Sequence, residues 1–307
     1  MIVAFTSGGQ LGNQLMFEAN LMATSMKYHI SYKNIAFKAK KYFEIKDSEQ
    51  SKYISYHKNL CKILAKYMYG IKRITSQNQV PGINVFLNED AVARQFVIQS
   101  DKDRLALFHC WPYLDIESLY EFQDEVRNAI RPKLKLYEEG KNKFEKVTEY
   151  YKDATFIGIH IRRKDYKDFL GGRYYYGYGV YKKRMEEAAK ATDGDVVFLI
   201  FSDEHINLIE LENPALYRVW VSNNTAIVDL VMMSLCDFLI GPPSTFSGWA
   251  SFWGKTPKHI MIDDQKQITD LKKKNFGVYM VDVMDNELDN TGRKILTYYE
   301  EGRKMAE

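Results

Sequence analysis

The chain has 307 residues, of which 46% are hydrophobic and 14% aromatic, which is enough for a large core and for two domains. Its 43 basic and 40 acidic residues leave a formal net charge of +3, too balanced for a surface dedicated to nucleic acid, so we expect any anion site to be local. Three widely spaced cysteines fit neither a disulfide framework nor a zinc site. The sequence shows neither a run of about eighteen apolar residues nor the pattern of a signal peptide, so we expect no membrane-spanning segment.

A strand, a glycine turn and a helix are predicted at the start of the chain. Residues 2–6 are apolar, two glycines follow, and apolar side chains then recur at helical spacing from Leu11. Glycines let the backbone approach a ligand, and the first turn of a helix offers free N–H groups to an anion. The segment Gly8–Gln14 is therefore a candidate ligand-binding turn, with a tight structural turn in which Asn13 and Gln14 are merely solvated as the alternative.

The first half is predicted to close with a strand at 105–113 and a helix at 117–130. The charged segment 141–153 is expected to link it to a second half, so we place the domain boundary at 153/154. Residues 31–104 hold a predicted helix around Leu60 but no pattern that indicates chemistry.

Residues 157–166, IGIHIRRKDY, carry the most functional information. Two-residue alternation puts three isoleucines on one face of a strand and Gly158, His160 and Arg162 on the other, with Gly158 leaving room for a ligand. Cations at the end of a core strand are costly to bury unless an anion meets them. His160, Arg162 and Arg163 therefore predict phosphate binding.

Several of these side chains have structural alternatives. The two arginines could form a surface ion pair with Asp165 or Asp168. Asp165 is also a candidate general base, although orienting Arg163 is its favoured role. Ser202 and Asp203 end the next predicted strand and point into the same crevice, or else Asp203 caps a helix that follows. Residues 173–178, RYYYGY, are a candidate mobile flap.

The second half alternates strands and helices in a Rossmann-like order, which predicts parallel strands with crossover helices. After 157–161, the strands are predicted at 196–201, 217–221, 238–240, 259–262 and 278–281, and the helices from 204, at 226–235 and after 247.

Asp229 and the loop GPPSTFS at 241–247 complete the predicted site. A carboxylate in the first turns of a helix is ordinarily explained by the helix dipole, but Asp229 could instead accept both the N1–H and the exocyclic amine of guanine. The loop follows a strand and opens a helix, so Ser244, Thr245 and Phe246 offer hydroxyl and backbone donors to a phosphate. Two aspartates at 193 and 195, in the sequence DGD, could together bind a metal ion. Because they precede a strand, we interpret them as a turn far from the ligand-binding edge, and no metal ion is expected.

Five segments, in order along the chain, are similar to the motifs of one known family. GGQLGNQLMFEANLMA resembles GGLGNQ(L/M)FQYA, and IHIRRKDY matches HxRRxDY. A GYWQ strand followed by a DIxxEIR helix is similar to FHCWPYLDIESLYEFQDEVRNAI, and an FSDD strand is similar to VFLIFSDE. The last motif, DLxLMSxCxHxIxANSSFSWWGAWL, is similar to DLVMMSLCDFLIGPPSTFSGWASFWG. These are the motifs of the α-1,2-fucosyltransferases of glycosyltransferase family 11. The HxRRxDY segment is shared with α-1,6- and protein O-fucosyltransferases.

The sequence departs from those motifs at three places. GPP replaces ANS, Glu204 replaces the second aspartate of FSDD, and Gly248 replaces the first tryptophan of the SWW pair. Residues 31–104 and the end of the chain are not covered by the resemblance. The departures leave the donor and the acceptor open.

The resemblance implies an α/β, GT-B-like fold with two Rossmann-type domains facing a cleft: an acceptor-side domain at 1–153 and a GDP-sugar-binding domain at 154–307. Arg162 would hold the β-phosphate, Asp229 would bind guanine, and Asn13 would face the sugar. The implied catalytic residues are Arg162, His160 and Asn13, and the implied donor-binding residues are Gly9, Gly12, His160, Arg162, Arg163, Ser202, Asp203, Asp229, Ser244, Thr245 and Phe246.

The resemblance thus implies an inverting enzyme that transfers L-fucose from GDP-fucose to a glycan hydroxyl, in α-1,2 linkage to a galactoside. GDP-fucose is the donor substrate, an oligosaccharide or glycolipid is the acceptor, and neither a cofactor nor a metal is expected. We expect a cytoplasmic protein, with a peripheral position at the inner membrane face as an alternative, and no nucleic-acid partner. Another GDP-sugar donor or linkage, or a non-catalytic glycan- or nucleotide-binding protein, remains as an alternative.

Overall fold

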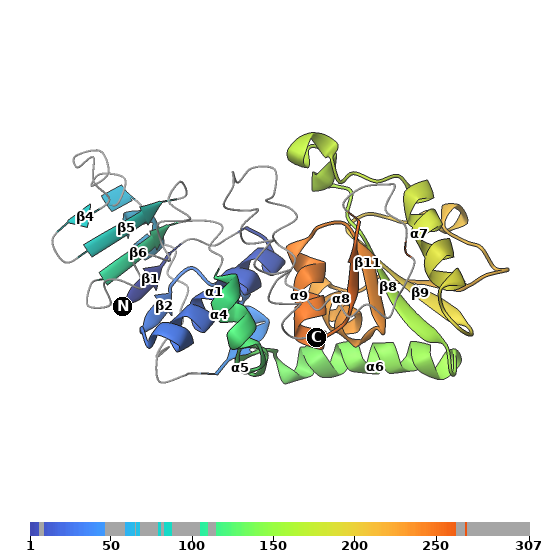
Figure 1. Cartoon of the computed structure of the whole chain (residues 1–307), viewed down its shortest axis with the longest axis horizontal. Helices are drawn as coiled ribbons and strands as arrows, with labels where there is room; N and C mark the ends of the chain where they lie inside the picture. The colour runs from blue at the N-terminus through green and yellow to red at the C-terminus, as the bar shows by residue number, and fades with distance from the viewer. Residues whose placement is uncertain are drawn as a thin grey trace. The chain divides into compact units, whose positions relative to one another are not determined.

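The structure is a computed structural model that describes residues 1–5, 9–46, 59–64, 66–67, 79–80, 83–87, 105–109, 115–261 and 268. The described residues divide into two compact units, one up to Arg131 and one from Pro132 onward (Figure 1). The predicted strand at 278–281 and residues 110–113 of the strand predicted at 105–113 lie outside the described residues.

The first unit is built on a mostly parallel sheet. Within the described residues the strand order is β2 (Tyr32–Asn34), β1 (Ile2–Ala4), β6 (Leu105–His109), β5 (Ile83–Leu87) and β4 (Gln79–Val80), and β4 alone runs antiparallel to its neighbour. Helix α1 (Leu11–Tyr28) joins β1 to its parallel neighbour β2, as a crossover requires. A further pair of strands joins β3 (Phe43–Ile45) to β7 (Ile130–Pro132).

Buried polar side chains hold α1 to its neighbours in this unit. The Glu18 carboxylate accepts hydrogen bonds from the Tyr32 hydroxyl (2.7 Å) and the Asn34 amide (2.8 Å). Burial nevertheless raises the pKa of Glu18 to about 7, because the charged form is poorly solvated there. The Thr24 hydroxyl donates to Asp115 (2.7 Å), which also caps α4 (Ile116–Glu121). The helix predicted at 117–130 is interrupted at residue 122, where α4 ends and α5 (Gln123–Ala129) begins.

The second unit contains a five-stranded sheet, within the described residues, in which all strands are parallel. Its order is β10 (Arg218–Val221), β9 (Val196–Ser202), β8 (Thr155–Ile161), β11 (Phe238–Gly241) and β12 (Lys258–Ile260). The expectation of an α/β fold with parallel strands is confirmed. Because β8 is central, its end meets the ends of β9 and β11 at one edge of the sheet.

Helices cover both faces of this sheet (Figure 1). The three isoleucines of β8 pack in one core cluster with Tyr181 and Met185 of α7 (Tyr178–Lys190). On the other face, α8 (Ala226–Leu235) packs against α6 (Leu134–Tyr150) and α9 (Thr245–Gly254). A side chain at Gly140 of α6 would meet Val231 of α8 at 2.6 Å, so the two helices approach closely there.

Three local predictions differ from the structure. The segment 141–153, expected to link the halves, is mostly part of α6, which packs on α8 and belongs to the second unit rather than to a domain ending at 153. The space beside Gly158 is filled by side chains, since a Cβ there would meet Leu239 at 2.5 Å, so this glycine permits packing and leaves no room for a ligand. The helix predicted from 204 is replaced by a turn and a short 3-10 helix at Leu208–Glu210.

Candidate active site

The carboxyl edge of the second sheet gathers most of the predicted site residues. His160, Arg162 and Arg163 come from the end of β8, and Ser202 and Asp203 from the end of β9. The loop 241–247 leaves β11 at the same edge, and Asp229 lies in the first turn of α8, just after β10. Carboxyl ends of parallel strands are where α/β folds bind ligands.

Arg162 is held in an ion pair at the end of β8. Its Nε and Nη2 donate to the two carboxylate oxygens of Asp165, at 2.9 and 2.5 Å, and its guanidinium lies 5.1 Å from the Tyr166 ring centre. Only 14% of the Arg162 side chain is exposed. The predicted alternative of an ion pair with Asp165 is therefore formed, although by Arg162 and not by Arg163. The pairing lowers the pKa of Asp165, which makes it a weaker base.

Tyr166 connects this arginine to the twin-proline loop. Its hydroxyl donates a short hydrogen bond to the Pro243 carbonyl, and burial raises the pKa of Tyr166 to about 12, so it stays protonated and keeps donating. In the same loop Ser244 caps α9 by accepting from the Phe246 backbone N–H (3.3 Å). The sequence reasoning gave Tyr166 no role, although it ends the HxRRxDY motif.

His160 lies beneath this loop and is almost fully buried. Its side chain is 5% exposed, its ring centre is 5.6 Å from that of Phe246, and its Nδ1 has no hydrogen-bond partner within the described residues. Burial, with Arg162 and Lys258 nearby, holds the pKa of His160 well below its usual value. A Cβ at Gly241 would meet the His160 carbonyl at 2.8 Å, so only glycine lets the loop pass this close. His160 is thus a neutral imidazole at neutral pH.

Lys258 is a cation of this site that the sequence reasoning missed. It begins β12, is 2% exposed, and donates from Nζ to the Pro242 carbonyl (3.3 Å) and the Ser247 hydroxyl (2.8 Å). The available signal was a lysine placed directly before an apolar strand, where a buried charge needs fixed partners.

Asp229 is a buried carboxylate with hydroxyl and amide groups beside it. It is 8% exposed and accepts a short hydrogen bond from Ser222, whose hydroxyl also accepts from the Asn224 amide (2.9 Å). Burial raises the pKa of Asp229, opposed by Ser222, Asn224 and the charge of Lys143. The carboxylate is held at the carboxyl edge in a polar setting, as a ligand acceptor requires.

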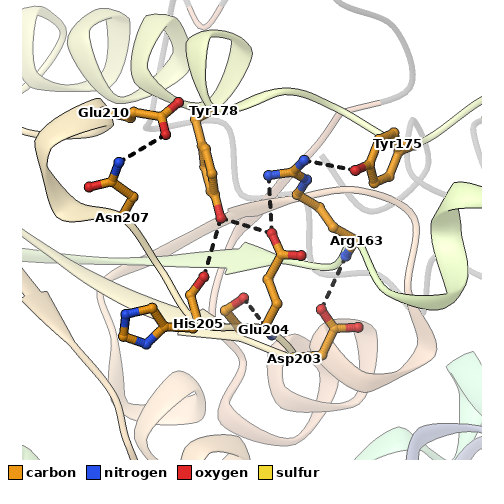
Figure 2. A network of polar contacts seen from close by, with 9 residues as sticks. Arg163, Tyr175, Tyr178, Asp203, Glu204, His205, Asn207 and Glu210 are labelled. Atoms are coloured by element: carbon orange, nitrogen blue, oxygen red, sulfur yellow. Dashed lines mark hydrogen bonds and ion pairs between the residues drawn. The ribbon is translucent and has the colours of Figure 1, made fainter.

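Arg163 makes contacts of a different kind from those of Arg162. Its backbone N–H donates to Asp203 (3.1 Å), its guanidinium pairs with Glu204 (3.0 Å), and Figure 2 shows Tyr175 and Tyr178 against it. Asp203 therefore caps the end of β8 and not a following helix. The Ser202 hydroxyl accepts from the Glu204 backbone N–H (3.1 Å), which turns the chain after β9.

The segment 173–178, predicted as a flap, is anchored at alternate residues. Tyr174 is fully buried, and the Tyr176 hydroxyl donates to the Met261 carbonyl at 2.8 Å. Tyr175, between them, accepts a hydrogen bond from Arg163 at 2.8 Å. These contacts tie the segment to the second unit.

Three predicted contacts, Gly9, Gly12 and Asn13, lie in the first unit. Gly9 has a positive φ of 73°, which only glycine adopts without strain, and Gln14 braces the turn by donating to the Gly9 carbonyl (2.9 Å). Gly12 is buried in α1, and Asn13 lies in its first turn. The geometry agrees with a tight turn, and their contact with a ligand remains a prediction.

Two classes of site are not found in the part of the chain that the structure describes. Those residues contain no group of three or more histidine, cysteine, aspartate or glutamate side chains that could hold a metal ion. None of their helices is long and apolar enough to cross a membrane.

The sequence matches a family model described as Glycosyl transferase family 11 over residues 1–276. The chain belongs to glycosyltransferase family 11. No curated protein sequence matches it.

The fold of this glycosyltransferase is shared with solved fucosyltransferase structures. A mutant of Arabidopsis thaliana FUT1 in complex with GDP is 14% identical, with a TM-score of 0.55, and the match covers 85% of this chain and 70% of that one. NodZ α-1,6-fucosyltransferase, a Bradyrhizobium protein soaked with GDP-fucose, is 13% identical, with a TM-score of 0.51, and the match covers 83% of this chain and 92% of that one.

Proposed function

We propose that this glycosyltransferase moves L-fucose from GDP-fucose to a glycan hydroxyl with inversion, in α-1,2 linkage to a galactoside. The observation that carries the proposal is the cationic site at the carboxyl edge of the second sheet, where Arg162, neutral His160 and the first turn of α9 come together. Family membership supports sugar transfer, and the neighbours solved with GDP and GDP-fucose support this donor.

The site suits the departure of a nucleoside diphosphate. When the bond between the fucose C1 atom and the β-phosphate oxygen breaks, negative charge grows on that phosphate, and a fixed guanidinium stabilises it most in the transition state. Arg162 would supply that guanidinium, and the hydroxyls and backbone N–H groups of Ser244, Thr245 and Phe246 would be further donors to the phosphate. No metal ion is required, because these groups already oppose the developing charge.

The acceptor oxygen forms its bond to C1 from the opposite face, which converts a β-linked donor into an α-fucoside. The proton of the acceptor hydroxyl then leaves to a base, for which we do not assign Asp165. Its carboxylate is engaged by Arg162 and its pKa is lowered. Gly9, Gly12 and Asn13 would contact the sugar, and Asn13 would contribute to catalysis.

Guanine selection is assigned to Asp229. One carboxylate can accept from both the N1–H and the exocyclic amine of guanine, and Asp229 is buried at the edge where the nucleotide would lie. Uracil presents no such pair of donors. Arg163, Ser202 and Asp203, also predicted as donor contacts, are occupied by one another and by Glu204 in this structure.

The remaining assignments extend the same proposal. The part of the chain before α6 would bind an oligosaccharide or glycolipid acceptor, across a cleft from a donor domain that begins with α6, in the GT-B manner. GDP-fucose would be a substrate, with no cofactor. We propose a cytoplasmic location or a peripheral one at the inner membrane face.

The guanine assignment is tested by nucleotide binding to the wild-type chain and Asp229→Asn, measured by calorimetry with GDP, inosine diphosphate and UDP. We expect GDP to bind roughly 10 to 100 times more tightly than inosine diphosphate, which lacks the exocyclic amine, because a hydrogen bond to a charged group is worth about 1.5–3 kcal/mol. Asp229→Asn should remove this preference. Asp237→Asn, at the opposite edge of the sheet, is the matched control and should retain it. Equal affinity for GDP and UDP contradicts the assignment.

The reaction is tested by incubating the protein with GDP-fucose and galactose-terminated acceptors and determining the product linkage by mass spectrometry and NMR. An α-1,2-fucoside supports the proposal. Transfer from a different GDP-sugar, or in a different linkage, would still identify a glycosyltransferase but would overturn the assignment of fucose or of the α-1,2 linkage.

A further inference from the structure

Arg163 is surrounded by partners from two separate segments of the second unit, residues 173–178 and the end of β9 (Figure 2). Its guanidinium pairs with Glu204 at 3.0 Å and donates to the Tyr175 hydroxyl at 2.8 Å. It also lies 4.8 Å from the Tyr175 ring centre and 4.5 Å from that of Tyr178. The cation is thus stacked against two aromatic rings and neutralised by one carboxylate.

The partners are themselves held. The Tyr178 hydroxyl, in the first turn of α7, donates to the same Glu204 oxygen at 2.8 Å. The Arg163 backbone N–H donates to Asp203 at 3.1 Å, which joins the end of β8 to the end of β9 through a second contact. The Arg163 Nε–H is buried without an acceptor within the described residues, as expected for a guanidinium covered by rings.

We propose that Arg163 is a positioning residue: with Glu204, Tyr175 and Tyr178 it fixes the backbone that carries Arg162, and it does not bind the donor. The inference rests on the proposed function of Arg162 and revises the predicted role of Arg163.

The reasoning starts from the geometry of a strand end. Neighbouring side chains of an extended chain point to opposite faces of the sheet, so fixing Arg163 on the face that α7 covers directs Arg162 to the face of His160. Arg162 then lies against Tyr166, which is bonded to the twin-proline loop. A catalytic charge must hold its place closely, since small displacements lower transition-state stabilisation strongly. Removal of Arg163 from its contacts to reach a phosphate would leave Glu204 partly buried without its cation, which is unfavourable.

The test is a double-mutant cycle with Arg163→Met and Glu204→Ala, read out in two ways. Hydrogen exchange of peptides that span 157–166 reports the order of the strand end without any need for activity. Steady-state transfer from GDP-fucose reports the effect on Arg162. Arg163→Met should speed exchange about tenfold and lower kcat/KM about tenfold, and Glu204→Ala should act in the same direction by no more than that. The double variant should fall no further than Arg163→Met, because Glu204 acts on the strand end through Arg163.

Two additional variants separate this role from general damage. Tyr175→Phe removes only the hydroxyl that accepts from Arg163 and should give a smaller change of the same kind. Arg173→Met is the matched control, because Arg173 is an exposed arginine that stacks on a tyrosine at 5.2 Å and has no ion pair among the described residues. It should exchange and turn over like the wild type.

The outcomes distinguish the two proposals. Additive losses, or loss of GDP binding in Arg163→Met while Glu204→Ala binds GDP normally, would make Arg163 a direct donor ligand and overturn the inference. Unchanged exchange in both single variants would overturn it too. If the wild-type chain neither binds GDP nor transfers fucose, the proposed function fails, while the exchange data still decide whether Arg163 and Glu204 fix the strand end.

Discussion

The two units bury polar groups for different purposes. In the first unit, Glu18 is bonded by Tyr32 and Asn34, and Asp115 by Thr24. At the carboxyl edge of the second sheet, Arg162 and Lys258 lie near His160, and Asp165, which pairs with Arg162, is about half exposed. The first network combines acids with neutral donors, whereas the second concentrates cations.

The comparison shows that burial of a polar group does not by itself indicate a site. Acids that are satisfied by neutral donors within the fold stabilise one arrangement of the chain and offer nothing to a ligand. Cations whose paired carboxylate faces solvent still favour an incoming anion. A structural network and a ligand site therefore differ in the sign of the buried charge and in the partners that the fold already gives to it.

The largest test of this comparison is Arg162→Ala. Removing a preorganised donor to the leaving phosphate should lower kcat by roughly 100- to 1,000-fold, about 2.7–4 kcal/mol of transition-state stabilisation. The midpoint of thermal unfolding should change little, because the Asp165 carboxylate is about half exposed and stays hydrated when its partner is removed. Kinetics and calorimetry on the same preparation measure both. Turnover at the wild-type level would mean that the cations of this edge are incidental.

Glu18→Gln tests whether the buried acids of the first unit serve stability and not the reaction. The folded-state pKa of Glu18 is about 7 and its ordinary value is 4.5, so the folded chain binds this proton more tightly than the unfolded chain. The resulting stability is fully present below pH 4.5 and is lost as the pH rises through 7, a change of about 3 kcal/mol. The Gln variant should lack this loss and be the more stable protein at pH 8.

Denaturant unfolding at pH 5 and pH 8 measures the difference between wild type and Glu18→Gln. Transfer activity at pH 7 should stay within about twofold of the wild type, because Glu18 serves the fold. A variant that loses activity but keeps its stability would place this acid in the site after all.

Asp165→Asn gives the smallest expected effect and separates two roles of one carboxylate. Asparagine keeps one oxygen that accepts from Arg162, so turnover should fall less than about tenfold if Asp165 only orients that arginine. A general base would lose about 100- to 10,000-fold on this change. Rate measurements over pH 5–9 decide between them.

Most elements of the second sheet could be predicted from sequence because their signals are local. The period of apolar residues located the helix at 226–235 and, within a residue or two, the strands at 196–201 and 238–240. The helix α6 was missed because its exposed surface is rich in lysine and glutamate and its buried side is narrow, with Gly140 at the closest approach.

Roles that depend on a partner distant in sequence could not be predicted. Gly158 was interpreted as space for a ligand, whereas Leu239 and Cys236 fill that space. Arg162 and Arg163 have identical side chains at adjacent positions, and only the fold shows that Glu204 and two tyrosines occupy one of them. The participation of Lys258 depends on the loop that folds over it.

The buried ammonium of Lys258 has a kinetic consequence. By holding the Pro242 carbonyl and the Ser247 hydroxyl at once, and with Tyr166 bonded to Pro243, it fixes the loop at several points before any anion arrives. The entropy of arranging these donors is therefore lost once, when the chain folds, and not at every turnover. A ligand that enters this edge encounters a rigid receptor, and its residence time then depends on the contacts it makes and not on closure of the loop.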